Sequence, residues 1–178
     1  MKVLPTVYNG RKYRSRTEAR WAVFLDQLRV RFEYEAEGYD LGDFYYLPDF
    51  WLPDLKCFME IKGMEPTADE CAKASLLAEF TKKDVYVFFG GPDLPWATDK
   101  NIAESAWFFP PSGGQDNQHW FCECQTCHRI DIQFNGLADR MRCHPGERKD
   151  YQPDSPRLKA AYEVASKYEF WSPPGGAK

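Results

Sequence analysis

Two short runs of the sequence carry two carboxylates and one ammonium group at a spacing that suits phosphodiester chemistry. Pro48 and Asp49 are followed, after ten intervening residues, by Glu60, Ile61 and Lys62. Both runs are rich in aromatic and aliphatic residues, which favours strands. Because side chains alternate along a strand, Glu60 and Lys62 are expected on the same face. Neighbouring strands could therefore present Asp49 and Glu60 to one metal ion.

The residue types indicate what such a site would do. Magnesium binds hard oxygen ligands and keeps several waters, so one or two carboxylates and a substrate phosphate suffice. The ion promotes ionisation of a bound water and neutralises charge on the phosphoryl oxygens. Lys62 would position that water or offset the developing negative charge. These features predict hydrolysis assisted by magnesium, for which manganese can substitute.

Hydrophobic periodicity and capping patterns predict the elements that position these residues. Capping boxes at Ser15–Glu18 and Thr67–Glu70 precede apolar residues at helical spacing. The apolar run at 85–89 is typical of a strand buried on both faces. The expected elements, in chain order, are a helix at 16–28, strands at 31–35, 45–52 and 57–62, a helix at 67–81 and a strand at 85–89. This order predicts an α/β fold.

The order of these elements around the Pro48-Asp49 and Glu60-Ile61-Lys62 runs resembles the PD-(D/E)xK nuclease superfamily, especially its phage-type members and Holliday-junction-resolving endonucleases. The resemblance covers residues 8–90. It implies a restriction-endonuclease-like core of order αβββαβ, with a mixed sheet flanked by helices.

The resemblance also implies roles for individual residues. Asp49 and Glu60 would bind magnesium, Lys62 would assist the attacking water, and Glu18 on the first helix would complete the site. Glu18 has a second interpretation, because it occupies the N3 position of the first capping box. The implied activity is a metal-dependent endonuclease acting on DNA, including branched DNA, and junction-resolving members imply a homodimer. RNA stays open as a substrate. The alternative is a degenerate nuclease fold that binds nucleic acid or protein without catalysis.

The distribution of charge indicates where a nucleic acid would bind. The net charge is −4, but residues 1–31 hold eight basic and two acidic side chains. A basic N-terminal surface could contact phosphates, and the acidic remainder would limit non-specific binding. A solvated charged face is the alternative. The predicted nucleic-acid-binding residues are Arg11, Lys12, Arg14, Arg16 and Arg20.

Four cysteines late in the chain have the spacing of metal ligands. Cys124 and Cys127 form a C-x-x-C pair, and Cys143 follows 16 positions later. In a reducing compartment this pattern favours structural zinc over disulfides, and the segment resembles a zinc ribbon. Cys122 is the preferred fourth ligand and His144 the alternative, with His119 and His128 also open. Ordinary reduced core cysteines are the competing interpretation, which suits Cys57 and Cys71.

Length and composition allow one domain with an appendage. The chain has 178 residues, of which 43% are apolar and 16% aromatic, as expected for a globular protein. It contains no apolar stretch of about 20 residues and no signal-peptide pattern, so we expect a cytoplasmic protein without a membrane partner. The expected organisation is a nuclease core at 1–109, a linker at 110–117, a zinc-ribbon-like segment at 118–150, a C-terminal helix at 151–171 and a tail at 172–178.

Overall fold

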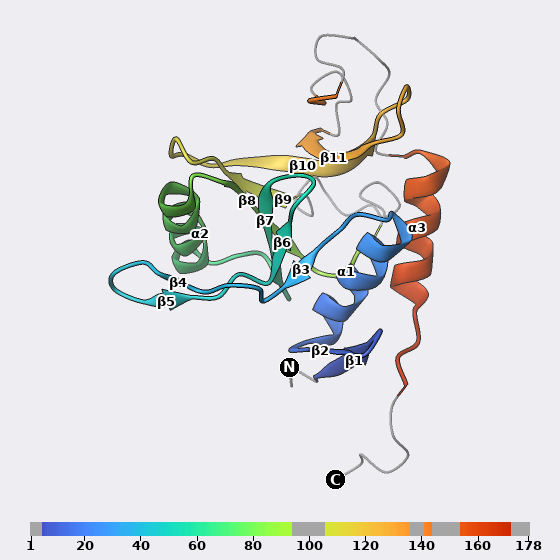
Figure 1. The fold of residues 1–178 in the computed structure, drawn as a ribbon, viewed down its shortest axis with the longest axis horizontal. Helices are drawn as coiled ribbons and strands as arrows, with labels where there is room; N and C mark the ends of the chain where they lie inside the picture. The colour runs from blue at the N-terminus through green and yellow to red at the C-terminus, as the bar shows by residue number, and fades with distance from the viewer. Residues whose placement is uncertain (1–4, 94–105, 136–140, 144–153, 172–178) are drawn as a thin grey trace.

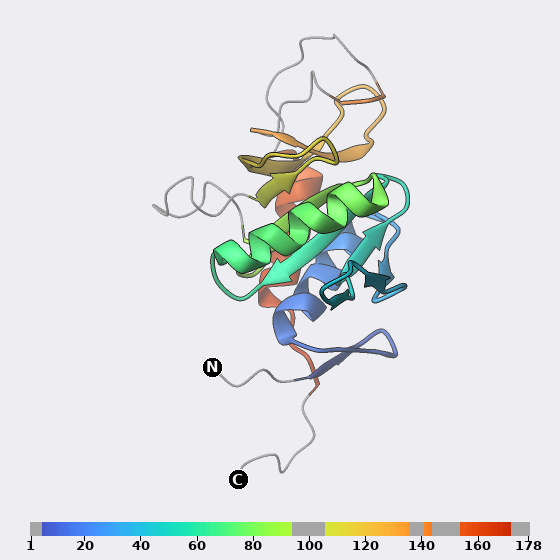
Figure 2. The same ribbon diagram turned by 90° about the vertical axis from the view of Figure 1, so that its left-hand side faces the viewer.

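A mixed seven-stranded sheet runs through the described part of the chain, with helices on both of its faces (Figure 1 and Figure 2). The computed structural model describes residues 5–93, 106–135, 141–143 and 154–171. The helices are α1 (Arg16–Gln27), α2 (Ala68–Thr81) and α3 (Pro156–Lys167). The sheet contains, in spatial order, β11 (Ile130–Phe134), β10 (Asp116–Glu123), β9 (Ala106–Phe109), β8 (Asp84–Phe89), β7 (Cys57–Lys62), β6 (Phe50–Leu52) and β3 (Glu33–Tyr34). Two hairpins lie outside it, formed by β1 (Thr6–Tyr8) with β2 (Arg11–Tyr13) and by β4 (Tyr39–Asp40) with β5 (Tyr45–Tyr46).

The pairing of β6, β7 and β8 fixes the geometry at the centre of the sheet. β6 and β7 are antiparallel, with Phe50 opposite Met59. β7 and β8 are parallel and α2 connects them, as a parallel pair requires a long crossover. One position beyond the Phe50–Met59 pair, Asp49 lies opposite Glu60. The sheet therefore brings together the two carboxylates that the sequence analysis singled out.

Each described helix begins at a hydroxyl side chain that caps it. Ser15 Oγ accepts a hydrogen bond from the Glu18 amide at the start of α1. Thr67 and Glu70 form a complete capping box at α2, and Ser155 caps α3, which has Pro156 in its first turn. The predicted helices at 16–28 and 67–81 are confirmed to within a residue or two. None of the described helices combines the length and apolar character needed to cross a membrane.

Hydrophobic clusters cover both faces of the sheet. On one face, α1 and α3 pack against each other and against the strands, and the ring centroids of Phe24 and Tyr162 lie 4.4 Å apart. On the other face, Leu77 of α2 packs with Phe58 and Phe109 of the sheet. Figure 2 shows α2 on the side of the sheet opposite to α1 and α3. The sheet is thus the middle layer of three.

The cysteine-bearing segment is not the separate appendage that the sequence analysis expected. β10 begins at Asp116, inside the expected linker at 110–117, and pairs with β9 and β11 as part of the large sheet. β9 was not predicted, and it supplies the partner that lets β10 join the sheet. The C-terminal helix is shorter than the range 151–171, and residues 144–153 and the tail at 172–178 lie outside the described residues.

Candidate active site and cysteine cluster

Asp49 and Glu60 lie side by side in the interior, where each is about 3% exposed or less. The Asp49 amide donates a hydrogen bond to Glu60 Oε1 at 3.1 Å. In the other direction, the Ile61 amide donates to Asp49 Oδ2 at 2.8 Å. Buried carboxylates are costly unless their oxygens have partners. These two reciprocal contacts hold the carboxylates next to each other.

Asp49 is placed differently from the sequence expectation, which put it within a strand. β6 begins at Phe50, one residue after it. Pro48 has no amide hydrogen to donate to a ladder and Asp is disfavoured in strands, so the strand starts late. The Asp49 carbonyl still accepts a hydrogen bond from the Glu35 amide at 2.9 Å, which keeps its backbone in line with β3. The carboxylate is therefore at the strand entrance, opposite Glu60.

Lys62 and Tyr46 both contact Glu60. Lys62 Nζ lies 3.4 Å from Glu60 Oε2 and shares its face of β7, as the alternation predicted. The Tyr46 hydroxyl, at the end of β5, donates a hydrogen bond to the same carboxylate. Burial and the charge of Glu60 raise the pKa of Tyr46, so the phenol stays protonated as a donor. Glu60 thus has a cation and a phenol as partners.

Arg14 reaches Asp49 from the segment between β2 and α1. Its Nη2 donates to Asp49 Oδ1, and its Nε lies 2.6 Å from Glu35 Oε1. Partial burial lowers the pKa of Arg14, but the charges of Asp49 and Glu35 and the hydrogen bond with Tyr34 together outweigh this effect and raise it overall. The sequence analysis assigned Arg14 to nucleic-acid binding. The structure instead gives it two carboxylate partners, although about half of its side chain stays exposed.

Glu18 is buried on α1 and serves as more than the partner of a cap. Ser15 Oγ donates to its Oε1 at 2.6 Å, and the Tyr34 hydroxyl donates to its Oε2. The same Tyr34 oxygen accepts a hydrogen bond from the Arg14 amide at 3.0 Å. Tyr34 therefore links Glu18 to the residue that contacts Asp49. The cap of α1 is present, because Ser15 Oγ accepts from the Glu18 amide, whereas the complete capping box, with the reciprocal bond to the cap amide, is found at α2. The role of Glu18 in the site stays a prediction.

The charges of the site favour a cation. Burial and the neighbouring Glu60 charge raise the pKa of Asp49 well above its ordinary value, and Glu18 adds to the shift. Partial burial lowers the pKa of Lys62, but Glu60 and Asp49 outweigh it and raise the pKa overall, so its amine is an ammonium. A divalent cation between the two carboxylates would reduce their mutual repulsion.

The three carboxylates do not form one tight ligand set. Among the described residues, Glu18, Asp49 and Glu60 are not grouped with one oxygen each within 4.8 Å of the others. Ligands of magnesium lie about 2.1 Å from the ion. In this arrangement one ion could take Asp49 and Glu60 as direct ligands, and Glu18 would act through its hydrogen-bond partners.

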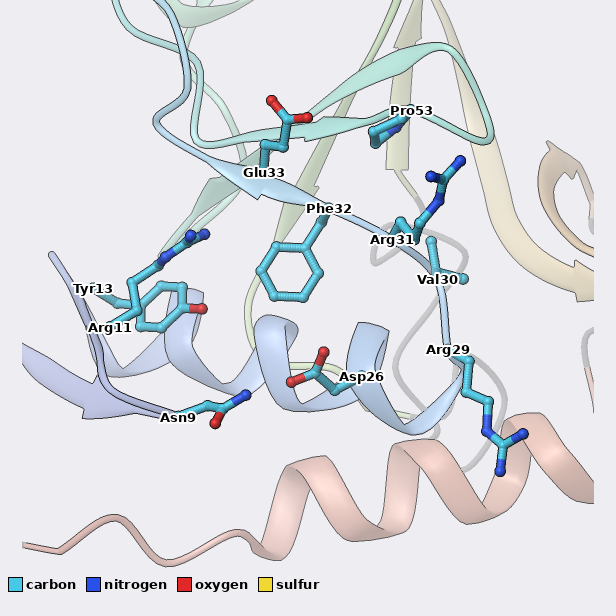
Figure 3. A pocket seen from close by; sticks show the side chains of 10 residues that line it. All are labelled: Asn9, Arg11, Tyr13, Asp26, Arg29, Val30, Arg31, Phe32, Glu33 and Pro53. Carbon is cyan, nitrogen blue, oxygen red and sulfur yellow. The ribbon is translucent and has the colours of Figure 1, made fainter.

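The predicted nucleic-acid-binding residues divide into different environments. Arg11, Lys12 and Arg16 are exposed, and Arg20 is half-buried on α1. Arg11 also lines a groove of about 660 Å³ with two arginines that the sequence analysis did not assign, Arg29 and Arg31 (Figure 3).

The groove lies between the β1–β2 hairpin, the end of α1 and β3, and its three guanidinium groups do not converge on one point (Figure 3). Arg31 also binds Asp54 through both carboxylate oxygens. Two carboxylates, those of Asp26 and Glu33, line the same groove, so its charge is mixed (Figure 3).

Cys124, Cys127 and Cys143 form the group of metal-ligating side chains that is found in the described part of the chain. Their sulfurs lie within 4.8 Å of one another. Cys124 sits in a tight turn after β10, where its amide donates to the Arg129 carbonyl and its carbonyl accepts from the His128 amide. This turn brings Cys127 back to Cys124, and residues 141–143 bring the third sulfur. The arrangement could bind a metal ion such as zinc.

The pKa values of two of these thiols, Cys124 and Cys143, are shifted in opposite directions. Burial raises the pKa of Cys124, but hydrogen bonds from the Cys127 and Thr126 amides and from the neighbouring thiols lower it to about 6. Burial and the bonds to Cys127 and Cys124 raise the pKa of Cys143 to about 12. A thiolate, not a thiol, is the form that binds metals. At neutral pH Cys124 is thus a thiolate and Cys143 a protonated thiol, and a metal ion bound by both sulfurs would displace the Cys143 proton.

Cys122, the preferred fourth ligand, is not part of this group. It lies within β10, and its sulfur is not among the three that lie within 4.8 Å of one another in the described part of the chain. Cys122 nevertheless belongs to the same buried cluster as Cys124, against which Cys143 packs. Cys122 is fully buried and packs with Met141. Burial raises its pKa well above the ordinary value, as for a core thiol. His144, the alternative, lies outside the described residues.

Comparison of the chain with models of protein families, with curated proteins and with solved structures finds no match.

Proposed function

We propose that this protein is a metal-dependent endonuclease that hydrolyses DNA phosphodiester bonds. The observation that carries the proposal is the buried pair of Asp49 and Glu60 with the Lys62 ammonium beside it. Two adjacent carboxylates with an ammonium group on the same side suit a cation and the phosphate that it would bind.

The order of elements supports the same proposal. α1, β3, β6, β7, α2 and β8 follow one another in the order αβββαβ expected of a restriction-endonuclease-like core, with the β4–β5 hairpin inserted. α1 and α2 cover opposite faces of the mixed sheet (Figure 2). The motif residues lie on β7 and at the entrance of β6, which are adjacent.

The proposed roles follow from the contacts. Asp49 and Glu60 would hold magnesium or manganese, which when bound supplies a polarised phosphoryl oxygen and a more acidic water. Lys62 would donate a hydrogen bond to a phosphate oxygen and offset negative charge as it builds up. Tyr46 orients Glu60, and Tyr34 orients Glu18 and the Arg14 backbone. The chain's own part is to hold these groups in position before the substrate arrives.

We further propose that Cys124, Cys127 and Cys143 hold a structural zinc ion. The site would fasten residues 141–143 to the turn that follows β10. Because β10 belongs to the same sheet as β7, zinc would stabilise an extension of the core and not an independent module.

Cleavage assays on purified protein test the nuclease proposal. With magnesium, we expect cutting of plasmid, single-stranded or branched DNA, and a loss of about 100-fold or more in Asp49→Ala and Lys62→Ala. Asp69→Ala and Lys73→Ala are matched controls, because these residues form an exposed ion pair on α2. The proposal is wrong if no DNA form is cut, or if the site variants cut as fast as the controls. DNA binding without cleavage would indicate the non-catalytic module, and RNA substrates in parallel would separate the two nucleic acids.

A further inference from the structure

An aromatic cavity of about 300 Å³ lies at the carboxyl ends of β7 and β8. It begins at Gly63, the residue that follows Lys62. The cavity is lined by side chains from α1, β8, β10 and α3. Its aromatic lining residues are Trp21, Phe88, Phe89, Trp120 and Tyr162.

Packing holds the cavity in shape. The rings of Trp21 and Phe88 lie 4.9 Å apart, and Phe88 stacks in turn on Phe121 at 5.3 Å. The Trp21 indole nitrogen donates a hydrogen bond to the Gly90 carbonyl at 3.0 Å. Trp21 and Phe88 are almost fully buried, so their positions are fixed by the core. An aromatic ligand would therefore meet a wall that is already formed.

The same backbone connects the cavity to the proposed active site. The Gly90 amide donates to the Lys62 carbonyl at 2.9 Å. Gly90 has φ +72, a conformation that favours glycine, and it turns the chain away from the end of β8. Within the described residues, a Cβ added at Gly63 or Gly90 would meet no atom within 4 Å.

We propose that the cavity receives one unpaired nucleobase of the DNA strand whose phosphodiester lies at Asp49, Glu60 and Lys62; this inference rests on the nuclease proposal. Every base offers a π-face that stacks on aromatic side chains. The exposed Asp93 carboxylate at the cavity could accept a hydrogen bond from an exocyclic amino group. The cavity volume of about 300 Å³ is at the lower end of the range for small-molecule sites, so it suits a ligand with a single planar ring system.

The occupant determines the class of substrate. A base inside a duplex is stacked and paired, and it reaches a pocket only after it leaves the helix at a cost of a few kcal/mol. A base in a single strand, a flap or a branch point is already available. The cavity therefore selects DNA that carries an unpaired nucleotide next to the scissile phosphate.

Single abasic substitutions along a fixed single-stranded oligonucleotide test the inference on the unaltered protein. Binding is measured without divalent cations, so that no strand is cut. We expect a position at which removal of the base weakens binding by about 5- to 150-fold, the range measured for stacked bases. Uniform small effects at all positions, or no binding to the oligonucleotide, would overturn the inference.

Protein variants then locate that base. Trp120→Ala should weaken binding of the intact oligonucleotide and abolish the penalty at the sensitive abasic position, whereas Trp120→Phe should restore both. Trp171→Ala is the matched control, because Trp171 is 80% exposed and does not line the cavity. If the penalty persists in a folded Trp120→Ala protein, the base does not occupy this cavity.

The outcome separates this inference from the nuclease proposal. If cleavage depends on Asp49 but no base position is preferred, the nuclease proposal stands and the base-binding inference is wrong. If one base position is sensitive but no DNA is cut in magnesium or manganese, the cavity binds a base and the nuclease proposal is wrong.

Discussion

The guanidinium group of Arg14 donates a hydrogen bond to Asp49 Oδ1, although the two residues are 35 positions apart in the chain. Arg14 is the closest basic partner of a carboxylate that the proposed function assigns to a divalent metal. A positive side chain and a metal ion would both be attracted to the same oxygens. Arg14 and the metal are therefore expected to compete.

Arg14→Ala should strengthen metal binding. Removing the competing cation should lower the dissociation constant for manganese or magnesium by about 3- to 10-fold. The measurement is the rise in melting temperature with metal concentration, because a ligand that binds only the folded state stabilises it. Arg31→Ala is the control, since that arginine pairs with the exposed Asp54. Weaker metal binding in Arg14→Ala would contradict the expected competition.

Ser15 and Glu18 should behave differently when changed one at a time. Ser15→Ala removes the cap of α1 and one hydrogen bond to Glu18, and should lower the free energy of unfolding by about 1 kcal/mol with a smaller loss of cleavage than Glu18→Gln. Glu18→Gln keeps the shape but removes the charge near Asp49, and should lower cleavage by about 10- to 100-fold. Melting curves and cleavage rates on the same preparations make the comparison. Equal losses of cleavage in the two variants would indicate that Glu18 only supports the helix.

Tyr46→Phe should weaken the site without disturbing the fold. The change deletes the hydroxyl that donates to Glu60 and leaves the ring in the cluster under α2. Loss of a group that orients a metal ligand typically lowers metal affinity or activity about 10- to 100-fold. Tyr45→Phe is the neighbouring control, because Tyr45 is 69% exposed. Magnesium titration of the cleavage rate measures the difference, and identical titrations would show that Glu60 does not depend on Tyr46.

Cys127→Ser and Cys143→Ser should lose the metal of the cysteine cluster. Elemental analysis is expected to find about one zinc per unaltered chain and none in these variants, and their melting temperatures should fall because metal binding contributes to folding. Cys57→Ser and Cys71→Ser serve as controls, because neither residue belongs to the cluster. If both cluster variants retain all of their zinc, the zinc site does not include Cys127 or Cys143.

Asp131→Asn should stabilise the protein at neutral pH. Burial raises the pKa of Asp131, so the folded state holds its proton more tightly than the unfolded state does. The protonated Asp131 therefore contributes to the free energy of unfolding. This contribution is complete below the ordinary pKa of about 4 and is lost as the pH rises through the raised pKa of the folded state. Asparagine can still accept from the Ile132 amide, which lies 2.9 Å from Asp131 Oδ1.

The melting temperature is compared at pH 5 and pH 7.5 for this variant. The gain from Asp131→Asn should be larger at pH 7.5. Asp54→Asn should give the opposite sign, because the hydrogen bond from Arg31 lowers the pKa of Asp54 and so stabilises the folded state above the ordinary value. A gain that is independent of pH would point to packing instead of charge.

Sequence patterns predicted the helices well because their signals are local. Ser15 and Thr67 each lie within three residues of the group they cap, so the starts of α1 and α2 can be read directly. The alternation of Glu60 and Lys62 on β7 is equally local and is confirmed.

Relationships between distant residues could not be predicted in the same way. Nothing near Arg14 in the sequence indicates Asp49, and nothing near Tyr46 indicates Glu60. The separate appendage was expected because the Pro- and Gly-containing segment at 110–117 resembles a linker, whereas pairing with β9 decides that β10 joins the sheet. Cys122 was favoured as a ligand from spacing alone, and spacing does not show that its sulfur stays outside the group formed by Cys124, Cys127 and Cys143. Tertiary pairing, which spacing does not encode, accounts for each of these differences.

The packing of α3 on α1 has a consequence for how the chain folds as it is made. Phe24 and Tyr162 are in contact but lie 138 positions apart. At a synthesis rate of about 5–20 residues per second, α1 leaves the ribosome on the order of 10 s before the helix that covers it. During that interval the apolar side of α1 must rest on a partial sheet or on a chaperone. The helix that carries Glu18 is therefore translated well before the helix that completes its enclosure.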